Sequence, residues 1–213
     1  MSCSSTRCAH WEATKHILHY LKGTSEFGLT LGRLDARLEA YVDADWASQP
    51  HRHSMSGYVV LLNGGPVAWS THKQPLIALS TAKAEYIALT TVAHKVLYLQ
   101  LLIDELYAVD EIPTPIYCNN QAAIALTSNG KFHSHTKHIN LHYHFVCSHI
   151  KDGMFTLQYC PMDDNIADAF TKALAHPHLQ KLCSLMSLDC TRGGVLNSDA
   201  SDDRPGGTEE MSE

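Results

Sequence analysis

The chain has 213 residues, of which 45% are hydrophobic and 18% are charged, and its net charge is −6. It is long enough for one well-buried α/β domain with tails and too short for two sizeable domains. A negative charge weakens attraction to phosphate and is unfavourable for a nucleic-acid enzyme, but most of this charge lies after Leu188 and the preceding chain is only slightly acidic.

The first predicted elements are an antiparallel meander and a long helix. β-Branched and aromatic residues gather in short runs, two of them around an Asn-Gly-Gly-Pro turn, and this pattern predicts adjacent antiparallel strands. Apolar residues then recur at helical spacing behind Ser80 and Thr81, either of which can cap a helix. The predicted strands are 38–43, 57–62 and 67–70, and the predicted helix is 80–107.

The second half of the chain predicts two further strands and three helices. A short strand follows two prolines and leads into a helix that Asn119 or Asn120 can cap, and this unit indicates a parallel strand beside the first. The predicted strands are 116–118 and 154–160, and the predicted helices are 121–127, 136–151 and 163–174. We therefore expect an α/β fold with a five-stranded mixed sheet, three antiparallel strands followed by two parallel ones, flanked by helices.

The cysteines and the hydropathy pattern indicate an intracellular protein, cytoplasmic or nuclear, with reduced thiols and no membrane partner. The seven cysteines form no CxxC pair, and no apolar run in the sequence suits a signal peptide or a membrane span. The sequence also has neither a GxxxxGK[ST] phosphate loop nor a Gly-x-Ser-x-Gly elbow. Nucleotide hydrolysis and acyl transfer are therefore not expected.

Acidic residues in three separate segments are the most informative feature of the sequence. Asp43 ends the first predicted strand in YVDADWA, Glu85 lies on the long helix in STAKAEYIAL, and Asp168 lies in NIADAFTKAL. Carboxylates that can be aimed at one shared point are what hard divalent cations require, so these three predict a metal site. Asp45 shares a strand face with Asp43. Asn119, in IYCNNQAAIAL, stands where we expect a fourth carboxylate.

These segments, in this order and with GYVVLLNGGPVAWSTHKQ and HSHTKHINLHYHF between them, resemble the ribonuclease H domain of copia-type LTR retrotransposon Pol polyproteins. The resemblance covers residues 10–174, and HWEATKHILHYLKGT resembles the segment that joins reverse transcriptase to ribonuclease H. It implies a ribonuclease H-like fold that hydrolyses the RNA strand of RNA:DNA hybrids with two Mg²⁺ ions, for which Mn²⁺ can substitute. It also implies the reverse transcriptase portion of a parent polyprotein as a partner.

The resemblance suggests three parts of the chain. Residues 1–36 are expected to be a remnant of the reverse transcriptase connection, and residues 37–175 a ribonuclease H-like domain. Residues 176–213 are expected to be a C-terminal extension, largely a disordered acidic tail, because Gly, Ser, Asp and Glu dominate its end.

The same resemblance implies catalytic roles for Asp43, Glu85, Asp168 and the position of Asn119. Asp43 matches the strand-borne Asp that bridges both metal ions, Glu85 the helix-borne Glu, and Asp168 the last acid of the site. Asn119 matches the remaining Asp, and an amide brings no negative charge and cannot orient a nucleophilic water as a carboxylate does. Cleavage is therefore expected to be severely reduced or absent. Alternatively, Asn119 merely caps the following helix.

Other departures from the family's motif residues indicate a degenerate copy. All of them can be reached by single C-to-T or G-to-A transitions. They are His16, His19, His53, His135, His142 and Cys147 in place of Arg, Lys83 in place of Glu, and Asn119 and Asn140 in place of Asp. We infer a degraded transposon copy. The alternative is a non-catalytic nucleic-acid or protein-binding module domesticated from a retrotransposon.

Several polar residues are candidate substrate contacts. Four of them are expected at the minor groove of the hybrid, where 2′-hydroxyls distinguish RNA from DNA, and two at the rim of the site. They are Ser54, Ser56, Asn120 and Gln121 in the first group, and Lys137 and His138 in the second. The i, i+4 pair of His138 and His142 also fits zinc, but it lacks a clear third and fourth ligand.

Overall fold

The chain divides into two compact units. The residues that the computed structural model describes are 3–32, 37–107, 113–129 and 137–190. One unit, Met1–Phe27 with Cys190–Glu213, contains the helix α1 (Cys3–Gly23). The other unit, Gly28–Asp189, contains a sheet with helices on both of its faces, and it holds all of the candidate catalytic residues.

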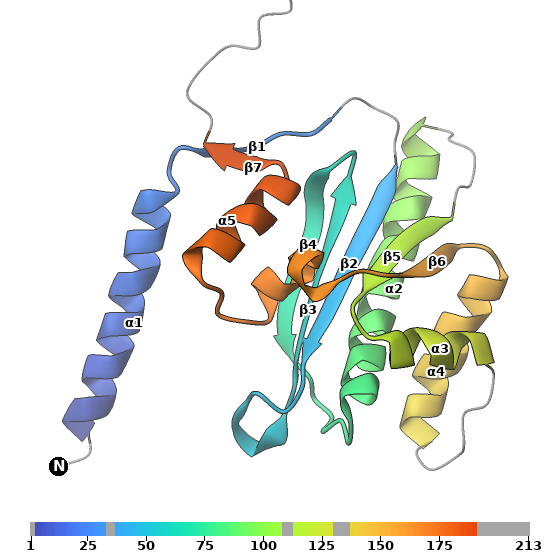
Figure 1. The fold of residues 1–213 in the computed structure, drawn as a ribbon, viewed down its shortest axis with the longest axis horizontal. Coiled ribbons are helices and arrows are strands. Elements are labelled where there is room, and N and C mark those ends of the chain that lie inside the picture. The colour runs from blue at the N-terminus through green and yellow to red at the C-terminus, as the bar shows by residue number, and fades with distance from the viewer. Residues whose placement is uncertain (1–2, 33–36, 108–112, 130–136, 191–213) are drawn as a thin grey trace, which may run out of the picture. The chain divides into compact units, whose positions relative to one another are not determined.

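A five-stranded sheet in the order β4-β3-β2-β5-β6 forms the centre of the larger unit (Figure 1). The strands are β2 (Leu38–Asp45), β3 (Met55–Leu62), β4 (Gly65–Lys73), β5 (Thr114–Cys118) and β6 (Phe155–Tyr159). β3 pairs antiparallel with β2 and β4, whereas β5 pairs parallel with β2 and β6. The predicted mixed sheet is therefore confirmed, and it has the ribonuclease H-like arrangement that was expected.

A two-residue turn joins β3 to β4 and sets their register. Leu62 pairs with Gly65, and the intervening Asn63 and Gly64 have φ angles of 51° and 82°. A left-handed backbone at both positions is what a type I′ hairpin requires, and Asn-Gly adopts it at low cost. Pro66 lies in the edge strand β4, where a missing N–H is tolerated.

Helices cover the two faces of the sheet. They are α2 (Thr81–Tyr107), α3 (Gln121–Asn129), α4 (Lys137–Lys151), η2 (Met162–Asp164), η3 (Ile166–Phe170) and α5 (His176–Leu185). On one face α2 and α4 build a core that includes Val42 of β2 and Val92 of α2. On the other face Ile166 and Leu182 pack beside Val59. Each such buried side chain contributes about 1.5–3 kcal/mol.

The predicted helix 163–174 is wrong, because the structure has two short 3-10 helices in that segment, η2 and η3. Asn165 lies between them with an extended backbone, at φ −76° and ψ 99°. Its side chain donates to the Val42 carbonyl at 3.0 Å and accepts from the Ala167 N–H at 3.2 Å. This bond to the central strand ends one short helix and caps the next, so a continuous α-helix does not form.

The packed unit extends beyond residue 175, where the resemblance placed the end of the domain. Leu182 of α5 and the adjacent Met186 are buried in the core beside β3. The short strands β1 (Phe27–Leu29) and β7 (Leu188–Cys190) form a separate two-stranded sheet. The predicted disordered part of the tail, from residue 191 on, lies outside the described residues.

Among the helices of the described ranges, α2 alone is long and apolar enough to cross a membrane, with a mean hydropathy of 1.4. Half of its apolar window is buried inside the protein. Val92 and Val96, which face the sheet, are fully buried. This burial is typical of the central helix of an α/β core, which is also apolar around most of its circumference.

Candidate active site

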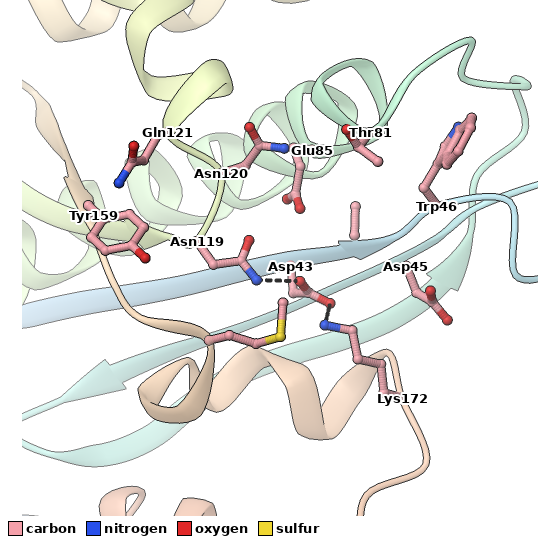
Figure 2. A pocket seen from close by; sticks show the side chains of 12 residues that line it. Asp43, Asp45, Trp46, Thr81, Glu85, Asn119, Asn120, Gln121, Tyr159 and Lys172 are labelled. Atoms are coloured by element: carbon pink, nitrogen blue, oxygen red, sulfur yellow. Dashed lines mark hydrogen bonds and ion pairs between the residues drawn. The ribbon is translucent and has the colours of Figure 1, made fainter.

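A cavity of about 570 Å³ opens where β2 and β5 end and α2 and α3 begin. Figure 2 shows that Asp43, Glu85 and Asn119 all point into it from different elements. Parallel strands carry their ligand sites at their carboxyl ends, so β2 and β5 bring Asp43 and Asn119 to one edge of the sheet. The structure therefore brings three of the four candidate catalytic residues to one cavity.

Asp43 is the centre of this site. It is 1% exposed, and its carboxylate accepts hydrogen bonds from donors on two sides. Asn119 Nδ2 lies 3.2 Å from Oδ1, and Lys172 Nζ lies 3.2 Å from Oδ2 (Figure 2). Thr171 Oγ1 also donates to Oδ2. Both oxygens of Asp43 are therefore engaged by groups of the protein.

Lys172 joins Asp43 to the third predicted acid, Asp168. Its Nζ is 3.0 Å from Asp168 Oδ1, and Asp168 is 2% exposed. The pKa of Asp168 is raised above its usual value, mainly by burial and then by the charge of Asp43. The ion pair with Lys172 lowers this pKa but does not cancel the rise. For Lys172, burial lowers the pKa, but the two carboxylates outweigh burial and the pKa is raised. Lys172 is therefore a charged bridge between two buried carboxylates.

Glu85, 4% exposed, approaches the cavity from the second turn of α2. The backbone N–H of Ala44 donates to its carboxylate, whereas Oε2 has no hydrogen-bond partner among the described residues. Burial and then the charge of Asp43 raise the pKa of Glu85 well above its usual range. A buried carboxylate oxygen without a partner is costly, and an oxygen of this kind is chemically able to bind a cation.

Glu85→Gln is expected to stabilise the fold at neutral pH. A raised folded-state pKa means that Glu85 favours folding below its unfolded pKa, about 4.3, and that this contribution is lost as pH rises through the folded pKa. The variant should therefore gain in melting temperature over the natural chain between pH 5 and pH 8. Thermal unfolding at several pH values checks this. Glu105→Gln, at an exposed carboxyl of the same helix, should show no such gain, and an equal gain there would contradict the assignment.

Asn119 and Asn120 have separate roles after β5. Asn120 Oδ1 accepts from the Ala123 N–H at 3.0 Å and caps α3. Asn119 instead directs its amide N–H at Asp43. The alternative in which Asn119 caps the helix is therefore wrong, because its neighbour does so. The Asn119 side chain is therefore not needed for the helix cap and points into the cavity.

The predicted substrate contacts are only partly brought together. Asn120 and Gln121 line the cavity. Ser54 and Ser56 are fully buried. Their hydroxyls are engaged inside the protein, since that of Ser54 accepts from the Ala47 N–H and that of Ser56 accepts from Gln74 Nε2. The structure therefore does not bring these two serines to the cavity. Lys137 and His138 begin α4, and their side chains lie outside the described residues.

A glycine brings the Lys172 segment close to Asp43. Gly57 pairs with Asp43 across β2 and β3, and a Cβ built on Gly57 would lie 2.7 Å from Thr171 Cγ2 and 2.9 Å from Phe170 Cβ. Real side chains do not approach this closely. Glycine at this position therefore lets the chain after η3 lie against the sheet, which places Lys172 beside Asp43.

Asn165→Ala is expected to destabilise the fold by about 1–3 kcal/mol, because it leaves the buried Val42 carbonyl and Ala167 N–H without these partners. It should also loosen η3, which carries Asp168. Urea denaturation with a constant m-value checks the loss. Gln121→Ala, at an exposed helix position, is the control and should change stability by less than about 0.5 kcal/mol. A loss no larger than that of the control would contradict this role for Asn165.

The metal ligands predicted from the sequence were Asp43, Glu85 and Asp168. Within the described ranges, no three His, Cys, Asp or Glu side chains converge closely enough to hold an ion as they stand. The reason is geometric: Lys172 lies between Asp43 and Asp168, and Asn119 supplies an N–H instead of an oxygen. The donor set nevertheless suits a hard cation, since it comprises carboxylates with one buried oxygen unpaired.

Lys172 is the main residue of the site that the sequence did not indicate as functional. Its only local signal is its spacing, four residues after Asp168, which allows an ion pair on a helix. The cavity is also lined by Trp46, whose Nε1 donates to the Ala78 carbonyl at 2.9 Å, and by Tyr159, which is 51% exposed. Neither carried a predicted role at the cavity.

No family model matches the chain. It is 37% identical over 166 residues to a retrovirus-related Pol polyprotein from transposon TNT 1-94 of Nicotiana tabacum, over 78% of this chain and 12% of that protein. It is 34% identical over 192 residues to one from transposon RE2 of Arabidopsis thaliana, over 88% of this chain and 13% of that protein. It thus spans only 12% to 13% of these relatives. A solved structure of LC11-RNase H1 in complex with RNA/DNA hybrid aligns with 63% of this chain and 94% of its own, with a TM-score of 0.47 and 15% identity.

Proposed function

We propose that this chain, a member of the copia-type retrotransposon Pol polyproteins, is their ribonuclease H domain, built for metal-dependent endonucleolytic cleavage of the RNA strand of RNA:DNA hybrids. We further propose that cleavage is impaired in this copy by Asn119. The observation that carries the proposal is the cavity in which Asp43, Glu85 and Asn119 meet. The resemblance implies a fourth carboxylate at position 119.

Hydrolysis of a phosphodiester needs an activated water, a stabilised leaving oxygen and neutralisation of the charge that builds on the phosphate. Two bound Mg²⁺ ions, or Mn²⁺ in their place, supply these effects. In this chain Asp43, Glu85 and Asp168 would hold the ions. Glu85 would contribute its unpaired Oε2, and Asp43 would contribute a buried carboxylate that lines the cavity.

Asn119 weakens this site in two ways. Its amide adds no negative charge, so the site attracts a divalent ion less strongly than one with a carboxylate there. Its N–H also donates to Asp43 Oδ1 at 3.2 Å and engages an oxygen that an ion would use. A carboxylate at this position would instead present acceptors toward both the ion and a water. These two effects support reduced or absent cleavage.

Two amide side chains at the cavity are candidate contacts for the substrate. Asn120 and Gln121 line the cavity, and their amides can donate to and accept from sugar hydroxyls in a minor groove. Phosphate contacts from Lys137 and His138 remain predictions. The proposed partners are an RNA:DNA hybrid and the reverse transcriptase portion of a parent polyprotein. Because the chain carries a net charge of −6, binding without that portion should be weak and sensitive to salt.

Binding tests the substrate class directly. Fluorescence anisotropy with an RNA:DNA hybrid and a DNA duplex of the same sequence, in Mg²⁺ at low and moderate salt, should show preference for the hybrid. Gel analysis of the same samples should show little or no cut RNA. Equal or tighter binding of the DNA duplex would contradict the proposal. Tight binding of the hybrid at moderate salt, without any cleavage on Asn119→Asp, would favour the domesticated binding module instead.

A further inference from the structure

We propose that Lys172 is a built-in counter-cation that holds the carboxylates of the metal site together and that a divalent ion must displace in order to bind. This inference rests on the proposed metal-dependent function. The Lys172 ammonium lies 3.2 Å from Asp43 Oδ2 and 3.0 Å from Asp168 Oδ1. A single ammonium therefore bridges two of the three predicted metal ligands.

Charge balance explains why a cation is needed at this point. Asp43 and Asp168 are 1% and 2% exposed, so two carboxylates are held close together with little water around them. Like charges in such surroundings repel strongly unless a cation lies between them. Lys172 is the only Lys or Arg side chain within the described ranges that forms an ion pair with either of them.

The bridge blocks a metal ion for reasons of geometry as well as charge. Asp43 Oδ2 forms the ion pair with Lys172 and also accepts from Thr171, whereas Oδ1 accepts from Asn119, so an ion that binds Oδ2 must displace Lys172 or Thr171. Glu85 Oε2, by contrast, is buried beside the cavity and unpaired among the described residues. The site thus has one ligand oxygen ready for an ion and others engaged by an internal cation.

Lys172 is placed to move aside. Its side chain is 28% exposed and lines the cavity, whereas the two carboxylates that it joins are almost fully buried. Its backbone N–H remains bonded to the Asp168 carbonyl at 3.0 Å, which holds the residue in place while the four-carbon side chain swings outward. A displaced ammonium would then lie at the cavity mouth.

The experiment compares Lys172→Met with the natural chain. Mn²⁺ and, separately, Mg²⁺ are titrated into each folded protein, and binding is measured by calorimetry and by the change in melting temperature. Methionine keeps most of the side-chain length and removes the charge. Without divalent ions the variant should melt at a lower temperature. Its affinity for Mn²⁺ should rise by about tenfold or more, because no internal cation competes. The ion should also raise its melting temperature by more than it raises that of the natural chain.

Lys181→Met is the matched control. Lys181 pairs with Asp164 at 2.7 Å on the exposed surface, and neither residue lines the cavity. Its loss should leave Mn²⁺ affinity unchanged. Should Lys172→Met not fold, Lys172→Gln, which keeps a donor, is titrated in its place and is expected to show the same direction of change.

The outcomes separate this inference from the proposed function. One outcome is that Asn119→Asp binds Mn²⁺, but that Lys172→Met binds Mn²⁺ no more tightly than the natural chain does. The counter-cation role of Lys172 is then overturned and the metal site stands. If no variant binds Mn²⁺, including Asn119→Asp and Asn119→Asp combined with Lys172→Met, both the role of Lys172 and the metal site are overturned.

Discussion

Asn119→Asp is expected to raise the rate at which this chain cleaves the RNA strand of an RNA:DNA hybrid on the order of a hundredfold or more, the scale of losing or gaining one preorganised charged group in an active site. The gain follows because the substitution replaces a donor at 3.2 Å from Asp43 with a charged acceptor in the same cavity. Single-turnover cleavage of a 5′-labelled RNA strand in Mg²⁺ and in Mn²⁺ measures it.

The neighbouring asparagine provides the control for this substitution. Asn120→Asp adds the same charge one residue later, but Asn120 caps α3 and aspartate caps a helix equally well. It should therefore not raise cleavage above the level of the natural chain. A natural chain that already cleaves as fast as Asn119→Asp would show that an amide is tolerated at this position, and the account of an inactivated copy would fail.

Asp43→Asn, introduced together with Asn119→Asp, is expected to remove the restored cleavage by at least about a hundredfold, since loss of a bridging ligand removes several kcal/mol of charge stabilisation. The structural reason is that Asp43 joins the other groups of the site, because Lys172 forms an ion pair with it and Thr171 and Asn119 donate hydrogen bonds to it. The same single-turnover assay measures the loss, and Mn²⁺ calorimetry shows whether the ion is lost with it.

Asp45→Asn in the same background distinguishes a specific ligand from a general loss of negative charge. Asp45 lies on the same strand face and also lines the cavity, but no described hydrogen bond or ion pair joins its carboxylate to Asp43, Asp168 or Lys172. Cleavage should fall by less than about threefold on this change, within the range of surface charge effects. If Asp45→Asn abolished cleavage and Asp43→Asn did not, the assignment of the bridging ligand would be reversed.

The fold was predictable where local chemistry decides it. The Asn63-Gly64 turn needs two left-handed residues, and the sequence supplies a pair that adopts them, so the meander around it could be predicted. The helix at Thr81–Tyr107 follows from apolar spacing and begins behind Ser80, whose hydroxyl accepts from the Lys83 N–H. The segment after Pro161 could not be predicted in the same way. There the backbone depends on the bond from Asn165 to the Val42 carbonyl, a contact 123 residues distant in the chain.

The site was likewise predictable where local structure places a side chain, and not where distant contacts do. Asp43, Glu85 and Asn119 follow from where a strand or helix places its side chains, and the structure brings all three to one cavity. The position of Lys172 depends on the close approach of the segment after η3 to Gly57, which no local pattern reveals. Ser56 is likewise bonded to Gln74, a residue 18 positions away. Tertiary contacts therefore decide which polar residues reach the cavity and which are buried below it.

Anomalous diffraction from Mn²⁺-soaked crystals of the natural chain and of Asn119→Asp shows whether position 119 controls metal binding at Asp43, because it locates the ion without relying on cleavage. The account predicts manganese bound to the Asp43 carboxylate in the Asn119→Asp crystals, with Lys172 turned away from Asp43, and weak or no manganese there in the natural chain. Crystals of the variant that hold no manganese at Asp43, or that hold it elsewhere in the protein, would contradict the account.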